Sequence, residues 1–152
     1  MKFTEFAAVV LLPFCVIAAE PNRNVIARGS YANSQCQFER NKTGRVAFMG
    51  GSITQMNGYR PMVASLLQKR FPETTFTFTP AGISSTCSTT GAFRLATDVL
   101  AKGPVDLFFI EFAVNDDQDA GHSSQECVRG MEGLSDRFAN TIQQLTWSSP
   151  IS

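Results

Sequence analysis

A serine follows two glycines at the end of a short apolar run, in Gly50-Gly51-Ser52. Glycines allow a tight turn, and such a turn at the end of a strand exposes the serine hydroxyl. An exposed hydroxyl with a neighbouring base is a nucleophile for acyl transfer. Two other interpretations stay open at this point: a purely structural turn, and a backbone nest for phosphate, although the loop has no lysine and no GxxxxGK[ST] pattern.

Two further positions carry groups that can stabilise negative charge. Gly82 ends a segment in which Phe76 and Phe78 alternate with threonines, and Asn115 ends a third apolar segment. Each is usual turn chemistry when taken alone. Together with Ser52, a backbone N–H at Gly82 and the Asn115 amide supply what acyl transfer needs, because negative charge develops on the carbonyl oxygen.

These three positions follow three predicted strands. The predicted strands are 45–49, 76–82 and 105–114, and helical spacing of apolar residues predicts helices over 59–71 and 92–100. Alternating strands and helices predict an α/β fold with a parallel sheet, whose ligands bind at the carboxyl ends of the strands. The continuous apolar character of 105–114 predicts a strand covered on both faces, in which Glu111 requires a partner.

The remaining segments are predicted from polarity and capping. Residues 20–44 are polar and without a period, which predicts a lead-in loop. Ser123 with Glu126 forms a capping box for a third helix that continues to Leu145.

Three blocks of the sequence resemble, in order, those of the SGNH/GDSL hydrolases. They are Phe48-Met-Gly-Gly-Ser-Ile-Thr54, Pro80-Ala-Gly-Ile83 and Ala113-Val-Asn-Asp116. The resemblance implies a flavodoxin-like three-layer α/β/α fold with a parallel sheet, and an esterase domain over 45–152. It implies Ser52 as the nucleophile and an oxyanion hole formed by the backbone N–H groups of Ser52 and Gly82 and the amide of Asn115. The chain departs from the family pattern at Gly51, usually Asp, and at Ala113, usually Gly.

The resemblance also implies a class of reaction. Members of the family hydrolyse acyl or acetyl esters, including esters of carbohydrates, and need no cofactor and no metal. The expected partner is therefore a small-molecule or carbohydrate ester. A non-catalytic relative that binds a carbohydrate or acyl ligand in the same crevice is the alternative. The oligomeric state stays open.

The family's base is not found in the sequence, which has no Asp-x-x-His block. The single histidine, His122, follows Asp116 in a polar stretch, and both are candidates for a loop that contacts the substrate. A solvated loop is the alternative for Asp116. For His122, a loop or helix-start residue is favoured over a role as the catalytic base. We therefore expect a fold that is incomplete at the C-terminus and a poorly active chain.

A frameshift near Gly133 would explain such a chain and would put residues 134–152 out of frame. The nucleotide sequence tests this hypothesis. A shifted frame that encodes neither further strands nor an Asp-x-x-His block would contradict it.

The first residues are typical of a secretory signal peptide, predicted over 1–19. A weakly positive end precedes the apolar run Phe6–Ala19, which is too short for a stable membrane anchor and ends in small residues. The mature protein is thus expected to be secreted or periplasmic. The 13 basic residues balance the 13 acidic ones, and this balance argues against nucleic acid as a partner.

Cleavage after the signal peptide would leave three cysteines, Cys36, Cys87 and Cys127. Their pairing cannot be decided from spacing. They include no CxxC pair, so the sequence predicts no zinc site.

Overall fold

The computed structural model describes residue 26 and residues 29–147. The chain divides into two compact units, residues 1–30 and 31–152, and the helices and strands of the described residues lie in the second. The predicted signal peptide, 1–19, falls outside the described residues. The elements are α1 (Ala32–Arg40), β1 (Thr43–Gly50), α2 (Ser52–Gln55), α3 (Tyr59–Arg70), β2 (Thr75–Gly82), α4 (Ser88–Asp98), the 3-10 helix η1 (Leu100–Lys102), β3 (Leu107–Glu111), the π-helix η2 (Asn115–Asp119) and α5 (Ser124–Trp147).

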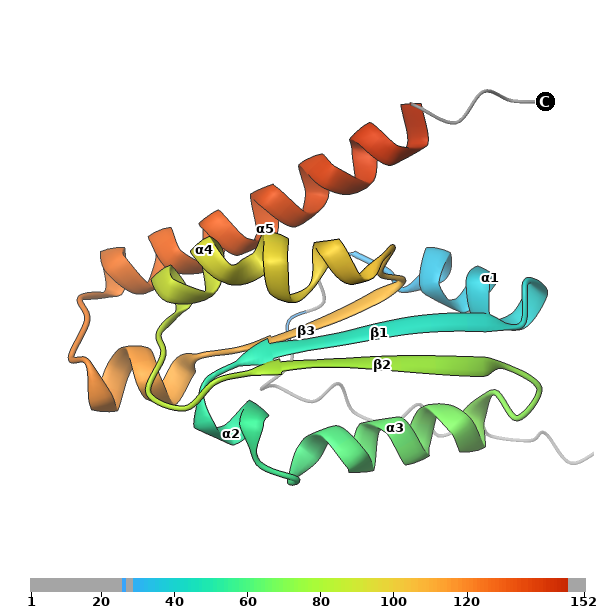
Figure 1. Ribbon diagram of the computed structural model, residues 1–152, viewed down its shortest axis with the longest axis horizontal. Helices are drawn as coiled ribbons and strands as arrows, with labels where there is room; N and C mark the ends of the chain where they lie inside the picture. Colours follow the sequence, from blue (N-terminus) through green and yellow to red (C-terminus); the bar gives the residue numbers. More distant parts are fainter. Residues whose placement is uncertain (1–25, 27–28, 148–152) are drawn as a thin grey trace, which may run out of the picture. The chain divides into compact units, whose positions relative to one another are not determined.

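The three strands form one parallel sheet in the order β2-β1-β3 (Figure 1). Gly50 at the end of β1 lies opposite Gly82 in β2 and opposite Glu111 in β3. The carboxyl ends of the three strands therefore lie together at one end of the sheet, as the sequence predicted. The α/β class with a parallel sheet is confirmed.

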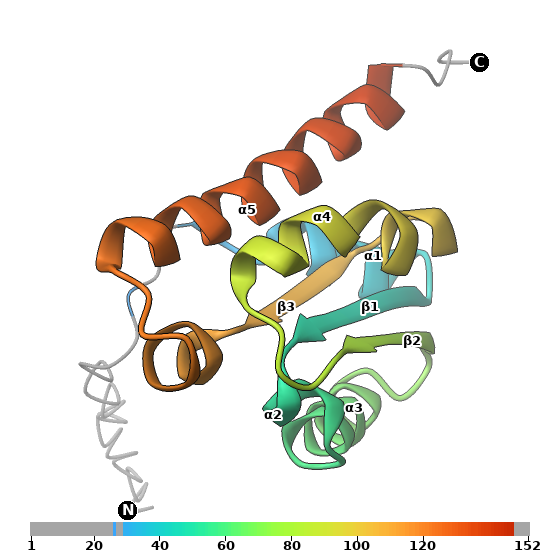
Figure 2. The same ribbon diagram turned by 60° about the vertical axis from the view of Figure 1, so that its left-hand side comes forward.

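Helices cover both faces of the sheet (Figures 1 and 2). The face that carries α2 and α3 is aromatic: the ring of Phe48 stacks on Phe109 with centroids 5.1 Å apart and meets Tyr59 edge-on at 5.9 Å. The opposite face packs against α4 and α5. Its buried core consists of Ala47, Met49, Ala81, Leu95, Val99, Phe112 and Leu134. Adjacent residues of β1 thus serve opposite faces, as a strand requires.

The lead-in segment 20–44 was predicted as a loop, but it contains the helix α1 and the start of β1. One side chain accounts for the helix. Phe38 is 2% exposed, and its ring meets those of Phe71 and Phe76 at 5.3 and 5.0 Å. Because a single buried ring fixes an otherwise polar helix, the segment has no apolar period for a sequence argument to find.

β3 is shorter than the strand predicted over 105–114, and its residues are less buried than that prediction implied. It ends at Glu111, and each of its five residues is half-buried. β3 pairs only with β1 in the described part of the chain, so its second edge is open. On one face, Phe108 contacts Phe138 of α5, with ring centroids 4.8 Å apart. The chain then leaves the sheet and buries Phe112 in the core.

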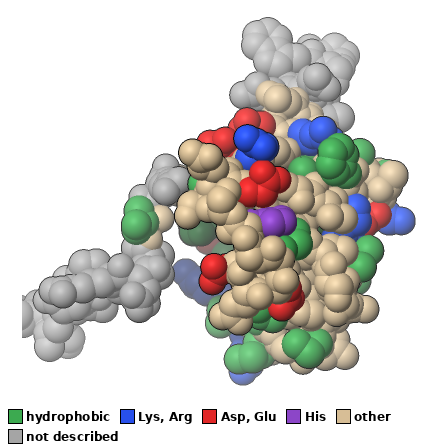
Figure 3. Space-filling model, turned by 90° about the vertical axis from the view of Figure 1, so that its left-hand side faces the viewer, with side chains coloured by type: hydrophobic (Ala, Val, Ile, Leu, Met, Phe, Trp, Pro, Cys, Tyr) green, Lys and Arg blue, Asp and Glu red, His purple; other side chains and the backbone are tan. Residues whose placement is uncertain are grey.

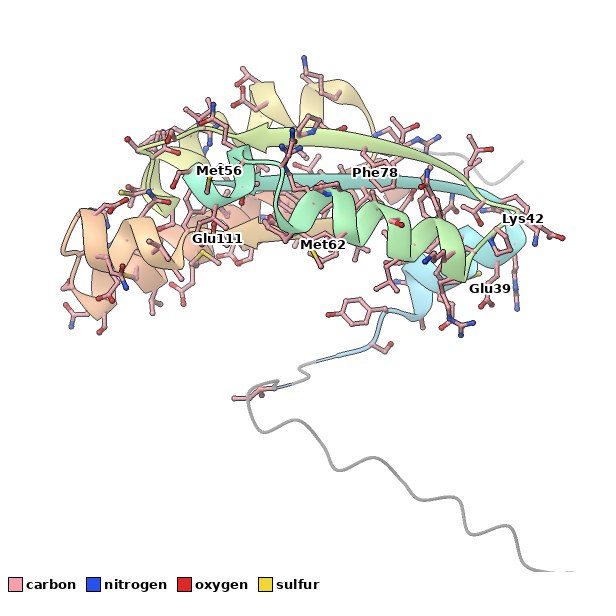
Figure 4. All side chains as sticks on the ribbon, turned by 90° about the horizontal axis from the view of Figure 1, so that it is seen from below. Glu39, Lys42, Met56, Met62, Phe78 and Glu111 are labelled. Carbon is pink, nitrogen blue, oxygen red and sulfur yellow. The ribbon has the colours of Figure 1, made fainter. Side chains whose placement is uncertain are left out.

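The predicted helix over 59–71 is present as α3, but part of its apolar surface is open. Met62 and Leu66 are 72% and 66% exposed, and Figure 4 views the molecule from this side, with Met62 labelled on α3. The capping box is also present, since the N–H of Glu126 donates to Ser123 Oγ at 3.3 Å. None of the helices described between residues 29 and 147 combines the length and apolarity needed to cross a bilayer.

Candidate active site

Three loops leave the sheet at the carboxyl ends of the strands. β1 leads through Gly51 to Ser52 at the start of α2, β2 ends at Gly82, and the segment after β3 leads to Asn115 at the start of η2. Figure 3 faces this end of the molecule, where acidic side chains and the chain's one histidine are visible. The three sequence blocks thus come together at one edge.

Ser52 is the first residue of a helical turn. The first N–H groups of a helix have no intrahelical acceptor, so the N–H of Ser52 is available to a ligand. Its side chain is half-buried, and among the described residues it forms no hydrogen bond. The hydroxyl is therefore available for chemistry.

The φ angle of Gly51, −85°, is one that any residue can adopt. The requirement for glycine is steric, because a Cβ at this position would overlap the side-chain oxygen of Asn115. The departure from the usual Gly-Asp-Ser has a local explanation: the amide of Asn115 occupies the space that a side chain at position 51 would need.

Gly82 is likewise needed for close packing. A Cβ there would overlap the backbone of Thr54 and Gln55 in α2. The N–H of Ile83 donates to the carbonyl of Gly50 at 3.0 Å. Successive N–H groups of a strand point in opposite directions, so the N–H of Gly82 points away from β1. Gly82 lets α2, and with it Ser52, lie against the end of β2.

Asn115 is 1% exposed and held in the π-helix η2. Its Nδ2 donates to Asp119 Oδ2 at 2.7 Å, and its Oδ1 has no hydrogen-bond partner. An amide nitrogen carries two hydrogens, so one donor of Asn115 remains for a ligand. A single π-helical turn inside a protein is often found at a functional site.

Glu111, which the sequence left in need of a partner, lies in a small polar network. Thr54 Oγ1 lies 3.4 Å from Glu111 Oε2 and 3.0 Å from the Tyr59 hydroxyl; Glu111 is labelled in Figure 4. Burial raises the pKa of Tyr59, the hydrogen bond to Thr54 partly offsets this rise, and the charge of Glu111 adds to it. This network connects α2, which begins at Ser52, to the end of β3 and to the start of α3.

Asp116 faces away from Asn115. It is 3% exposed, and its Oδ1 accepts a hydrogen bond from the N–H of Ser88 at 2.8 Å. His122 Nδ1 lies 3.7 Å from the same oxygen. The solvated-loop alternative is therefore wrong for Asp116, because the turn of η2 carries its carboxylate inward to the start of α4.

Cys87 lies beside these two residues. Burial raises the pKa of its thiol, and the carboxylates of Asp116 and Asp119 raise it further. In the structure, Cys36, Cys87 and Cys127 are all free thiols. The sequence alone could not place Cys87 here, because the approach depends on how α4 packs against η2.

Arg94 is a residue that the sequence argument missed. Its guanidinium lies 3.4 Å from the carbonyl oxygen of Ala81 and 3.5 Å from that of Gly50, and it pairs with Asp98 at 2.6 Å. It thus caps carbonyls at the ends of β1 and β2. The only signal in the sequence is the i,i+4 spacing of Arg94 and Asp98, which is common on any helix.

No protein-family model matches the chain, and no curated protein matches it. Solved structures do match. A two-domain esterase (CEX) active on acetylated mannans, co-crystallized with mannopentaose, is 35% identical over 72% of this chain, with a TM-score of 0.62. A second structure of that esterase is 32% identical over 81% of this chain, with the same TM-score of 0.62. The chain covers 31% and 32% of the lengths of these two structures.

AlinE4, an SGNH-hydrolase family esterase, shares the fold. It is 20% identical over 65% of this chain, with a TM-score of 0.55, and the chain covers 55% of its length. The fold, the order of the three blocks and their meeting at one sheet edge agree with one another. The chain thus resembles the SGNH/GDSL hydrolases in its sequence blocks and shares the fold of an SGNH-hydrolase family esterase.

Proposed function

We propose that the chain is a serine ester hydrolase that removes acyl or acetyl groups, with Ser52 as the nucleophile. One observation carries the proposal: the Asn115 amide lies directly against Gly51, next to a serine that opens a helix. A hydroxyl, a backbone N–H and a side-chain amide close to one another at the carboxyl ends of the strands support the proposal. Acyl transfer requires such a set.

In the proposed reaction, Ser52 Oγ attacks the ester carbonyl carbon. The carbonyl oxygen becomes an oxyanion, which accepts hydrogen bonds from the N–H of Ser52 and from Asn115 Nδ2. The N–H of Gly82, the third donor that the family resemblance implies, points away from β1 and would join them only after a turn of the backbone. The alcohol leaves with a proton, and water then releases the acid from the acyl-serine. Removing one such donor costs roughly 3 kcal/mol of barrier in well-studied hydrolases.

The serine proton needs an acceptor. His122 is the only histidine in the sequence, and its Nδ1 is directed at Asp116. No hydrogen bond joins His122 to Ser52 in residues 29–147. We therefore expect slow turnover by the chain as printed, sustained by the oxyanion donors alone.

An acetylated carbohydrate is the proposed substrate. The 35% identical relative acts on acetylated mannans, and an extracellular polysaccharide agrees with the predicted signal peptide. The loops outside the three blocks decide which sugar binds, so the proposal names the substrate class only.

Covalent labelling with a fluorophosphonate tests the nucleophile. We expect the chain to gain one phosphonyl group at Ser52, slowly because no base is paired with the hydroxyl, and the Ser52→Ala variant to gain none. Hydrolysis of p-nitrophenyl acetate should fall to the background rate in the same variant. The matched control is Ser65→Ala, which removes an exposed hydroxyl from α3. Equal labelling of Ser52→Ala and the unmodified chain would contradict the proposal.

Ligand binding without turnover is the second candidate function. The one histidine lies beside Asp116 rather than beside Ser52, and this position favours the second candidate. Under this alternative, Ser52→Ala would retain affinity for acetylated manno-oligosaccharide, and neither protein would react with the fluorophosphonate.

A further inference from the structure

Three side chains from separate parts of the chain meet on the inner side of η2. Cys87 precedes α4, Asp116 lies in η2, and His122 precedes α5. One potential ligand atom of each lies within 4.8 Å of the others. We name this group the Cys87 cluster. It is distinct from the serine site, because Asn115 faces Gly51 whereas Asp116 faces Ser88.

The polar atoms of the Cys87 cluster are incompletely paired. The Asp116 side chain is 4% exposed, and the nearest His122 nitrogen, at 3.7 Å, is beyond hydrogen-bonding distance. That nitrogen is buried and has no partner. The hydroxyl of Ser88, a residue that is 0% exposed, also has none. Buried polar groups are nearly always paired, so the unpaired nitrogen of His122 is free to bind a ligand at this place.

The three side chains are of the types that zinc selects. Thiolate, imidazole and carboxylate are its ordinary protein ligands. Ligand atoms on a tetrahedral ion with bonds of about 2.0–2.3 Å lie roughly 3.3–3.8 Å apart. The separation of His122 Nδ1 and Asp116 Oδ1, 3.7 Å, falls in this range. The other two pairs of ligand atoms lie within 4.8 Å of each other.

We propose that the Cys87 cluster binds a divalent transition-metal ion of the zinc class. Three protein ligands leave a fourth position for water or a neighbouring oxygen. The ion joins the start of α4, the turn of η2 and the start of α5, so its role is to fix the turn that holds Asn115. The sequence predicted no zinc site because these ligands form no local spacing pattern.

Two other states of the same residues are possible. One is an ion pair between protonated His122 and Asp116. The other is a disulfide between Cys87 and Cys127, whose Sγ lies 4.0 Å from the carbonyl oxygen of His122. Metal binding differs from both, because it needs Cys87 as a free thiolate and His122 as a neutral ring.

The test is metal binding by the full chain as printed, purified and stripped with a chelator. Titration with zinc chloride in a calorimeter should give one ion per chain, and zinc should raise the thermal midpoint. Cobalt chloride should produce a thiolate-to-metal charge-transfer band. We expect Cys87→Ser and His122→Gln to weaken zinc binding by at least about tenfold, the scale found even for groups that only orient ligands.

The control is Cys36→Ser, which removes an exposed thiol from α1 at the opposite end of the sheet and should bind zinc unchanged. His122→Gln carries the test if Cys87→Ser fails to fold, because His122 is partly exposed. No zinc bound by the unmodified chain, or unchanged binding by both variants, would overturn the proposal. So would a Cys87–Cys127 disulfide found by mass spectrometry in the purified chain. None of these readouts depends on esterase activity.

Discussion

At the scale of single residues, Gly51 and Asn115 constrain each other. The amide of Asn115 fills the space beside the Gly51 backbone, so a side chain at position 51 and this placement of the amide exclude one another. The structure thus accommodates the departure from the family pattern at Gly51.

The raised pKa of Tyr59 predicts how the free energy of unfolding changes at high pH. Its pKa is raised by burial, whereas the unfolded phenol ionises near pH 10. Above about pH 10 the unfolded chain loses this proton and the folded chain keeps it, so the free energy of unfolding falls as pH rises. Tyr59→Phe should make that fall shallower, while loss of the hydrogen bond to Thr54 costs about 1 kcal/mol at neutral pH. Urea unfolding at a series of pH values measures both effects.

The matched control is Tyr31→Phe, which removes the other tyrosine from a position that is 77% exposed. A change in the alkaline slope of equal size in both variants would contradict the assignment to Tyr59.

At the scale of elements, α4 and α5 cross closely because small residues lie between them. A Cβ on Gly130 of α5 would overlap the hydroxyl of Ser88, and its distance to the backbone nitrogen of Thr89 would be 2.9 Å. A Cβ on Gly133, one turn later, would meet only the Cβ of Ala92, at 3.3 Å. Two glycines of the same helix therefore have different surroundings.

This difference predicts opposite effects of the same substitution. Gly130→Ala should destabilise the chain by about 1–3 kcal/mol, because overpacking outweighs the better helix propensity of alanine. Gly133→Ala should be neutral or stabilising by up to about 1 kcal/mol. Chemical denaturation of both variants gives the comparison. If Gly130→Ala proves as stable as Gly133→Ala, α4 and α5 do not cross as described.

Some elements could be predicted from the sequence and others could not. β1, β2, α3 and α4 follow local apolar periods, and the ends of parallel strands must meet, so Ser52, Gly82 and Asn115 could be brought to one edge by pattern alone. α1 could not be predicted, because one side chain, Phe38, provides its burial. Nor could η2 or the Cys87 cluster, since Asp116 meets Ser88 across 28 residues through the packing of α4.

At the scale of the whole molecule, the described sheet has two different edges. The N–H of Ile83 donates to β1, and the alternation of the strand turns position 80 outward. That position is Pro80, which has no N–H to offer to another strand. β3 has no such protection on its free edge between Leu107 and Glu111.

We expect the chain to associate through β3 as its concentration rises, because an unprotected edge pairs with other strands. Sedimentation velocity over a range of concentrations measures this. Leu107→Lys, at the start of β3, should reduce association, since a charge on an edge strand opposes pairing. Met62→Lys is the control, because it adds the same charge to the exposed face of α3. A reduction by Met62→Lys alone would place the contact on α3 and contradict the prediction.

The π-helical turn η2 joins two adjacent residues to two different places: Asn115 to the serine turn and Asp116 to the Cys87 cluster. Whatever stiffens one side of this turn lowers the entropy cost of ordering the other. Binding at the two places is then thermodynamically linked. An ion at the Cys87 cluster would change the affinity of the serine site for an oxyanion analogue, and the analogue would change the affinity of the cluster for the ion by the same factor.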